Sequence, residues 1–243
     1  MISSKRDHPW KREELILALD LYMKNHYTPI ADDPDVVALS SILQKLPIHP
    51  KNVRTDKFRN TNSISMKCAN FQELDEEIPG GLSAGSKLGK EIWEEFHNDQ
   101  SRLKSYSAKL KEIANQDSNF LEEISEIVSP DESKNIEVAE GEIFYRLHKY
   151  KERNSLIVRK KKNEALEKKG CLVCEVCGFD FQSIYGELGE GFIECHHAKP
   201  ISELQAGEKT RMQDLVLVCS NCHRMLHRKG MHTITAIQEK IQL

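Results

Sequence analysis

The chain has 243 residues, with 35 basic and 38 acidic side chains and a formal net charge of −3. This length allows one large domain or two small ones. The acidic balance excludes a uniformly cationic nucleic-acid-binding protein, so phosphate binding would need a local basic surface. No stretch approaches the roughly 20 apolar residues of a membrane span, and the N-terminus lacks the apolar core of a signal peptide. We therefore expect a cytoplasmic protein without a membrane partner.

Residues 1–105 predict four helices, because apolar side chains recur there at helical spacing. The four sets are Leu15, Leu19 and Tyr22; Val36, Leu39 and Leu43; Ile64, Cys68 and Phe71; and Leu88, Ile92 and Phe96. Pro34 suits the start of the second helix, and Asn62 or Ser63 is expected to cap the third.

Residues 106–135 predict a helix followed by a break at Ser129-Pro130-Asp131, and we place a linker near 129–138. The chain is acidic from Asp117 to Glu142 and strongly basic from Arg146 to Lys169. Residues 140–168 predict one long basic helix that Gly170 ends. Such a basic stripe suits phosphate binding, although a solvated helix face would have the same composition.

Six of the seven cysteines lie in the C-terminal third, which favours a local metal site over a chain-wide disulfide framework. Cys174 and Cys177 form one Cys-x-x-Cys pair, and Cys219 and Cys222 form another. Four thiolates suit a tetrahedral structural Zn²⁺. Cys171 offers an alternative pairing with Cys174, but Gly178 provides the tight turn expected directly behind the first pair.

Four histidines flank the second cysteine pair. Residues 192–196 and 215–219 predict two strands, and residues 221–229 predict a helix. His223 and His227 are four residues apart and share a helix face, whereas His196 and His197 face opposite ways in a strand. We expect all four imidazoles to gather around a second ion.

The arrangement C-x-x-C-G…E-x-H-H-x-x-P…D-L-x-L-V-C-x-x-C-H-x-x-x-H, over about residues 171–230, resembles the HNH endonuclease family with its ββα-metal fold. The resemblance implies that His196, His223 and His227 bind a catalytic divalent metal and that His197 is the general base. It further implies hydrolysis of double-stranded DNA to 5′-phosphate and 3′-hydroxyl ends. Three imidazoles suit Mn²⁺, Ni²⁺ or Zn²⁺ better than Mg²⁺.

Several neighbouring residues are candidates for supporting roles. Asp214 stands where the family often has the Asn that ties down the loop between the strands, and Glu194 is expected to orient a metal-bound histidine. Arg224 and Arg228 are candidates for clamping phosphates, with plain surface charge as an equal alternative. The candidate DNA contacts on the basic helix are Lys160, Lys161 and Lys162.

The N-terminal segments Trp10–Leu15, Ser63–Phe71, Gly80–Leu82 and Trp93–Phe96 resemble those of predicted HNH restriction endonucleases. The resemblance implies a role in target recognition, including recognition of modified bases. Basic residues precede the third predicted helix and could place it in a major groove; the candidates are Arg54, Lys57 and Arg59. A packing or dimerisation domain is an equal alternative.

Together these features predict an α+β fold with a mainly helical domain over residues 1–128, a linker and basic helix over 129–165, and a nuclease domain over 166–243. The favoured function is a restriction-type DNA endonuclease acting as a homodimer. The alternatives are a non-catalytic zinc-binding adaptor and a homing, repair or toxin nuclease.

Overall fold

The computed structural model describes residues 8–83, 85–127, 141–154, 156–198, 211–228 and 232–241. By its internal contacts the chain divides into two compact units, Met1–Glu126 and Ile127–Leu243. The linker expected near 129–138 lies outside the described residues. Within the described part, no helix is long and apolar enough to cross a bilayer.

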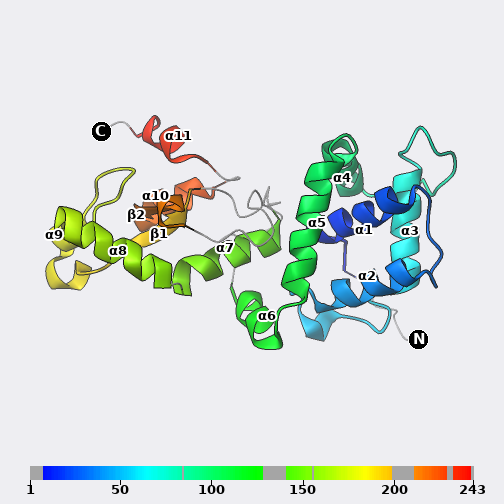
Figure 1. Ribbon diagram of the computed structural model, residues 1–243, viewed down its shortest axis with the longest axis horizontal. Helices are drawn as coiled ribbons and strands as arrows, with labels where there is room; N and C mark the ends of the chain where they lie inside the picture. Colours follow the sequence, from blue (N-terminus) through cyan, green and yellow to red (C-terminus); the bar gives the residue numbers. More distant parts are fainter. Residues whose placement is uncertain are drawn as a thin grey trace, which may run out of the picture. The chain divides into compact units, whose positions relative to one another are not determined.

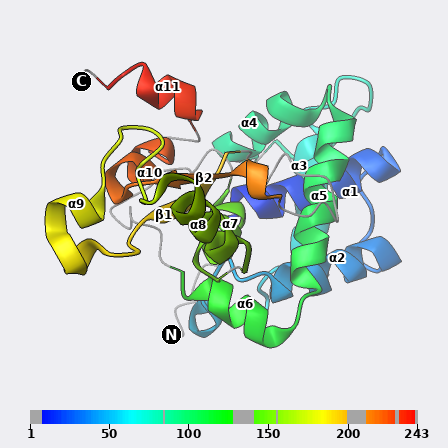
Figure 2. The same cartoon turned by 60° about the vertical axis from the view of Figure 1, so that its left-hand side comes forward.

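The N-terminal unit is helical, and its central element is α1. Figures 1 and 2 show α1 enclosed by α2, α3, α4 and α5, and α1 packs against each of them. Most of α1, from Glu13 to Tyr22, is buried as a result. The helices of this unit are α1 (Arg12–Asn25), α2 (Pro34–Lys45), α3 (Thr61–Gln72), α4 (Lys87–Phe96), α5 (Gln100–Ala114) and α6 (Ser118–Ser125), with a short 3-10 helix η1 (Lys51–Val53).

The predicted N-terminal helices are all present, but the cap expected for α3 was wrong. Asn60 caps this helix, and its side-chain oxygen accepts a hydrogen bond from the Ser63 backbone N–H. Helix α3 therefore starts at Thr61, because the Asn60 side chain satisfies one of the first free backbone N–H groups of the helix. Pro34 does begin α2, with Asp33 as its cap.

A buried ion pair holds α1 to the segment before α3. The Glu14 carboxylate accepts two hydrogen bonds from the Arg59 guanidinium, each 2.7 Å long. Arg59 is only 1% exposed and also donates to the backbone carbonyls of His8 and Pro9. Burial would raise the pKa of Glu14, but hydrogen bonds from His49 and Arg59 outweigh it and hold that pKa below its usual value.

The C-terminal unit is built on a two-stranded antiparallel hairpin. Strand β1 (Glu194–His197) pairs with β2 (Leu215–Val218), so that His196 lies opposite Val216 and His197 opposite Leu215. The helices around this hairpin are α7 (Glu142–Asn154), α8 (Leu156–Lys169), α9 (Phe181–Tyr185), α10 (Ser220–Leu226) and α11 (Ile234–Gln238), with the 3-10 helices η2 (Gly186–Gly189) and η4 (Met212–Asp214).

The expected long basic helix is described as two helices, α7 and α8, on either side of residue 155, which is outside the described residues. Gly170 ends α8 with a positive φ of 70°, as expected for a helix C-terminus. Figure 2 shows α7 and α8 beside the hairpin, and they pack against β1 and β2 respectively. Ile157, Val158 and Ala165 of α8 join the core around the hairpin.

Glu14→Gln is expected to lower the unfolding free energy at neutral pH by about 3–5 kcal/mol, because it leaves the Arg59 charge buried without its partner. The pKa of Glu14 is lowered in the folded state. Its stabilising contribution is therefore complete above its ordinary pKa of 4.5 and is lost as the pH falls further. The unfolding free energy of Glu14→Gln should therefore fall less than that of the wild type when the pH is lowered below 4.5.

Urea unfolding followed by circular dichroism, at neutral pH and at a pH below 4.5, measures both effects. Glu91→Gln is the matched control, because Glu91 pairs with Lys87 on the exposed surface of α4 and should contribute less than about 0.5 kcal/mol. Equal stabilities of the two variants would contradict the prediction.

Candidate metal centres and active site

Four cysteine thiols form one cluster in the C-terminal unit. The sulfur atoms of Cys174, Cys177, Cys219 and Cys222 all lie within 4.8 Å of one another, and none is in a disulfide. The Cys177 and Cys219 sulfurs are 3.7 Å apart. A tetrahedral ion with metal–sulfur bonds of about 2.3 Å would place its ligand sulfurs about 3.8 Å apart. The cluster therefore has the size and donor set of a four-thiolate metal site.

The first cysteine pair is fixed to the hairpin by its own backbone. The Glu175 N–H donates to the Leu217 carbonyl over 2.8 Å, and the Leu217 N–H donates to the Glu175 carboxylate over 2.9 Å. Gly178 follows the pair with a φ of 73°, and its N–H donates to the Cys174 carbonyl. The tight turn expected from this glycine is thus present.

The second pair lies at the start of α10. Cys219 is the N-cap residue, and its sulfur accepts a hydrogen bond from the Cys222 backbone N–H. Cys171, the alternative partner considered for Cys174, lies outside the cluster with its sulfur against the Lys169 carbonyl. The structure thus selects Cys174 and Cys177 as the first pair.

Three histidines form a second cluster. Ligand nitrogens of His196, His223 and His227 lie within 4.8 Å of one another, and the ring centroids are 4.9–5.3 Å apart. His196 comes from β1, whereas the other two lie one turn apart on α10 and at its end. His196 and His223 are buried, and His227 is half-buried.

The adjacent His197 has a different position. Among the described residues it is not part of the three-histidine cluster, so the expectation that four imidazoles gather around one ion holds for three. Alternation along β1 puts Glu194 and His196 on one face and Cys195 and His197 on the other. His197 is the last residue of the strand and is 2% exposed.

Glu194 contacts the histidine cluster through His223. Its carboxylate is hydrogen-bonded to Nδ1 of His223, which directs the other ring nitrogen toward the cluster. This hydrogen bond lowers the pKa of Glu194 to about 2, so the carboxylate is ionised at neutral pH. The contact has the geometry expected of a residue that orients a ligand.

Asp214 closes the base of the hairpin. Its carboxylate accepts a hydrogen bond from the Arg211 backbone N–H over 2.8 Å, and its carbonyl accepts from the Ala198 N–H over 2.8 Å. The bond from Ala198 joins the two ends of the loop between the strands, and the bond from Arg211 fixes the second of those ends. A carboxylate can accept here where an amide would both accept and donate.

The candidate phosphate contacts of this unit differ in their surroundings. Arg224, Arg228 and Lys160 are exposed, and Lys161 is half-buried. Lys162 donates a hydrogen bond to the Gly191 carbonyl over 3.2 Å, which ties α8 to the segment before β1. Exposed side chains on α10 remain the simplest candidates for meeting a backbone phosphate.

The N-terminal candidates are engaged inside their own unit. Arg59 is enclosed by Glu14 and two carbonyls, so its guanidinium has no surface to offer a phosphate, which corrects the expectation of a DNA contact at this residue. Arg54 donates to the carbonyls of Leu46 and His49 beside the end of α2. Only Lys57 of the three is exposed.

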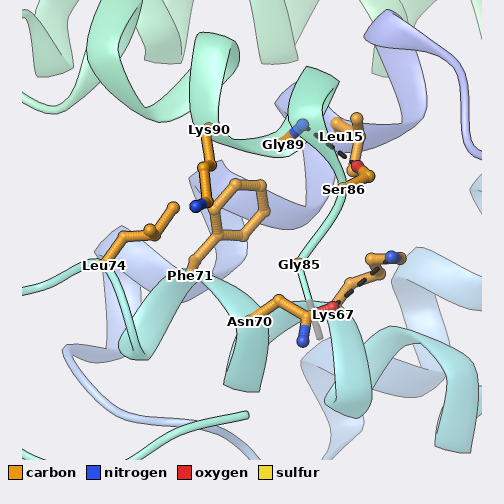
Figure 3. Close-up of a pocket in the computed structure, with 9 residues that line it drawn as sticks. All are labelled: Leu15, Lys67, Asn70, Phe71, Leu74, Gly85, Ser86, Gly89 and Lys90. Atoms are coloured by element: carbon orange, nitrogen blue, oxygen red, sulfur yellow. Dashed lines mark hydrogen bonds between the residues drawn. The ribbon is translucent and has the colours of Figure 1, made fainter. Parts of the chain in front are cut away.

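A small pocket lies between α1, α3 and α4 (Figure 3). Its lining includes Leu15, Phe71 and Lys90, and Figure 3 shows the Lys90 side chain beside the Phe71 ring. These two apolar side chains are almost completely buried, so they offer little surface on which a base could stack. We assign no ligand to this pocket.

The structure adds one residue that the sequence did not single out. Lys149 of α7 places its ammonium 3.2 Å from Nε2 of His223. In the sequence Lys149 is one of many basic residues between 146 and 169, and nothing in the local pattern separates it from the others. Only the packing of α7 against β1 brings it to the histidines.

The family comparison agrees with this geometry. The model of the HNH endonuclease family matches residues 174–229, which include all four clustered cysteines and the three clustered histidines. Comparisons with curated proteins and with solved structures gave no match for this chain. An HNH domain indicates a nuclease-type function with DNA as the substrate. Residues 174–229 are therefore an HNH endonuclease domain, with four clustered cysteines that fit its zinc-binding type.

Proposed function

We propose that the chain is a metal-dependent, restriction-type endonuclease that hydrolyses phosphodiester bonds in double-stranded DNA. The observation that carries this proposal is the cluster of His196, His223 and His227 beside a separate four-cysteine site. Three protein ligands leave further coordination positions open, as catalytic metal sites require, whereas four thiolates close a structural site.

The two sites have different tasks in this proposal. Cys174, Cys177, Cys219 and Cys222 would hold a structural Zn²⁺ that fixes the first cysteine pair to α10. The three histidines would hold the catalytic divalent ion, for which Mn²⁺, Ni²⁺ and Zn²⁺ suit imidazole nitrogen better than Mg²⁺. When bound, this ion supplies charge neutralisation at the phosphate and stabilises the leaving 3′ oxygen.

The chain's own groups perform the remaining steps. We assign His197 as the general base, which takes a proton from a water as the water oxygen attacks the phosphorus in line. The bond to the 3′ oxygen breaks, and a proton completes the 3′-hydroxyl while the phosphate stays on the 5′ end. Glu194 orients His223 through its Nδ1, and Asp214 holds the base of the hairpin that carries both His196 and His197.

A non-catalytic zinc adaptor is disfavoured by the buried histidines. His196 and His223 are 1% and 2% exposed. Enclosing three imidazoles around one point has a desolvation cost that an adaptor would have no reason to bear. Homing, repair and toxin nucleases share the chemistry, and the target of cleavage separates them from the restriction type.

The N-terminal unit is proposed to select the DNA target, with exposed Lys57 among its contacts. Within the described residues the chain has one histidine cluster, so cleavage of both strands would need two copies acting together. In the C-terminal unit, Arg224 and Arg228 are proposed to bind backbone phosphates because both are exposed on or directly after α10.

His197→Ala is expected to reduce the cleavage rate by about 10²–10⁴-fold, the contribution typical of a general base. Metal affinity should remain unchanged, because His197 lies outside the histidine cluster. His223→Ala is the contrasting variant and should lose both metal affinity and cleavage. Plasmid cleavage rates and calorimetric Mn²⁺ titrations measure the two properties, and full activity of the His197 variant would remove this residue from its assigned role.

Cys222→Ser is expected to abolish tight zinc binding and to unfold the C-terminal unit, because structural zinc contributes about 10–16 kcal/mol in small zinc domains. Cys171→Ser is the matched control and should keep its zinc, since Cys171 lies outside the cluster. Elemental analysis after removal of weakly bound metal, together with circular dichroism, measures both outcomes. Loss of zinc from the Cys171 variant would contradict the assigned ligand set.

The restriction assignment predicts that the chain distinguishes plasmids by their methylation. Methylated and unmethylated plasmids should be cut at clearly different rates, with linear product as the direct result when two copies act on both strands. Gel analysis of nicked and linear DNA over time measures both properties. Equal cutting of the two plasmids would favour a nuclease of another class, and exclusively nicked product would contradict the paired arrangement.

A further inference from the structure

The ammonium of Lys149 lies at the histidine cluster. Lys149 is on α7, which packs against β1, and its Nζ is 3.2 Å from Nε2 of His223. The two residues are separated by 74 positions in the sequence, so the contact depends on the fold of the unit. Lys149 itself is half-buried.

His223 has a contact on each of its two ring nitrogens. The Glu194 carboxylate lies against Nδ1, so this nitrogen carries the ring proton and donates it in the hydrogen bond. Because an ammonium can only donate, Nε2 presents its lone pair to Lys149. This is also the tautomer that binds a metal ion, and the Lys149 ammonium therefore marks the direction in which the His223 lone pair points.

An ion and the ammonium cannot both occupy this direction. A metal bound to imidazole lies about 2.0–2.1 Å from the nitrogen, well inside the 3.2 Å separation of Nζ from Nε2. A divalent ion bound to His223 would thus displace the ammonium. Because the Lys149 side chain starts from α7, which packs on β1, the displaced ammonium would stay close to the histidine cluster, within reach of a phosphate held there.

Other basic side chains near this position have partners elsewhere. Arg146, one turn earlier on α7, is paired with Glu142. Lys162 of α8 donates to the Gly191 carbonyl. Lys149, by contrast, places its ammonium against a histidine of the cluster.

We propose that Lys149 is a catalytic residue that donates a hydrogen bond from Nζ to a non-bridging oxygen of the scissile phosphate. This inference rests on the proposed nuclease function. An ammonium held at that oxygen would stabilise the charge that develops there during hydrolysis. In the absence of DNA, the ammonium lies against His223 and opposes the binding of a divalent ion there. When DNA binds, the ammonium leaves His223 and contacts the phosphate.

The test compares Lys149→Gln and Lys149→Arg with the full-length wild type, and with Lys240→Gln as the control for an exposed lysine of the same unit. Calorimetry with Mn²⁺ and no DNA should show about tenfold tighter binding for Lys149→Gln, because a nearby positive charge is removed. The cleavage rate of this variant should fall about 100-fold, and Lys149→Arg should recover part of it.

DNA binding supplies a readout that does not depend on cleavage. In a His197→Ala background with Mn²⁺, the anisotropy of a labelled DNA duplex gives the affinity over a range of salt concentrations. Loss of one phosphate contact should reduce the slope of log affinity against log salt by about 0.9 for Lys149→Gln. Lys149→Arg and Lys240→Gln should keep the original slope.

An unchanged slope for Lys149→Gln would overturn the phosphate contact, even if Mn²⁺ binds more tightly. Normal cleavage by Lys149→Gln would overturn it as well, while leaving the nuclease function intact. If the wild type binds DNA with Mn²⁺ but cuts none, the nuclease proposal fails, and the salt slope still decides whether Lys149 contacts phosphate.

Discussion

The C-terminal unit brings four thiols from two distant parts of the chain to one point. This cluster joins the turn at Cys174 and Cys177 to the start of α10, and α10 in turn carries His223 and ends at His227. The hairpin contributes few backbone hydrogen bonds of its own, because each strand has only four residues. The positions of His223 and His227 are therefore tied to the second cysteine pair through α10.

Helix α10 has seven residues and contributes side chains to both the cysteine cluster and the histidine cluster. Cys222 and His223 are adjacent, so their side chains leave the helix in different directions, and one meets the other thiols while the other meets His196 and Glu194. His227 follows one turn later on the same face as His223. Soft sulfur and borderline imidazole nitrogen thus form two distinct donor sets a short distance apart.

Much of this site could be predicted from the sequence because it is encoded by short spacings. The two Cys-x-x-Cys pairs and the separation of four between His223 and His227 are local, and the structure brings both groups together. The end of β1 at His197 also agrees with the expected split of the histidine pair, since His196 joins the cluster of three and His197 does not. Adjacent residues of a strand leave the backbone in opposite directions, so a ligand role and a separate role are natural for such a pair.

Long-range contacts explain what the sequence could not supply. Arg59 resembled a surface cation beside other basic residues, and only the fold reveals that Glu14, 45 positions away, encloses it. Lys149 likewise reaches His223 through the packing of α7 on β1. Likewise, the basic composition of α8 gave no sign that Ile157, Val158 and Ala165 pack against the core of this unit.

The central claim is that α10 contributes to two chemically different metal sites. Titration of the metal-free protein with Co²⁺, followed by optical absorption, tests it directly, because cobalt bound to thiolates and cobalt bound to imidazoles have different spectra. The account predicts two successive spectral changes, one with thiolate character that Cys222→Ser removes and one without it that His223→Ala removes. A single class of site, or the loss of both spectra in the His223 variant alone, would contradict it.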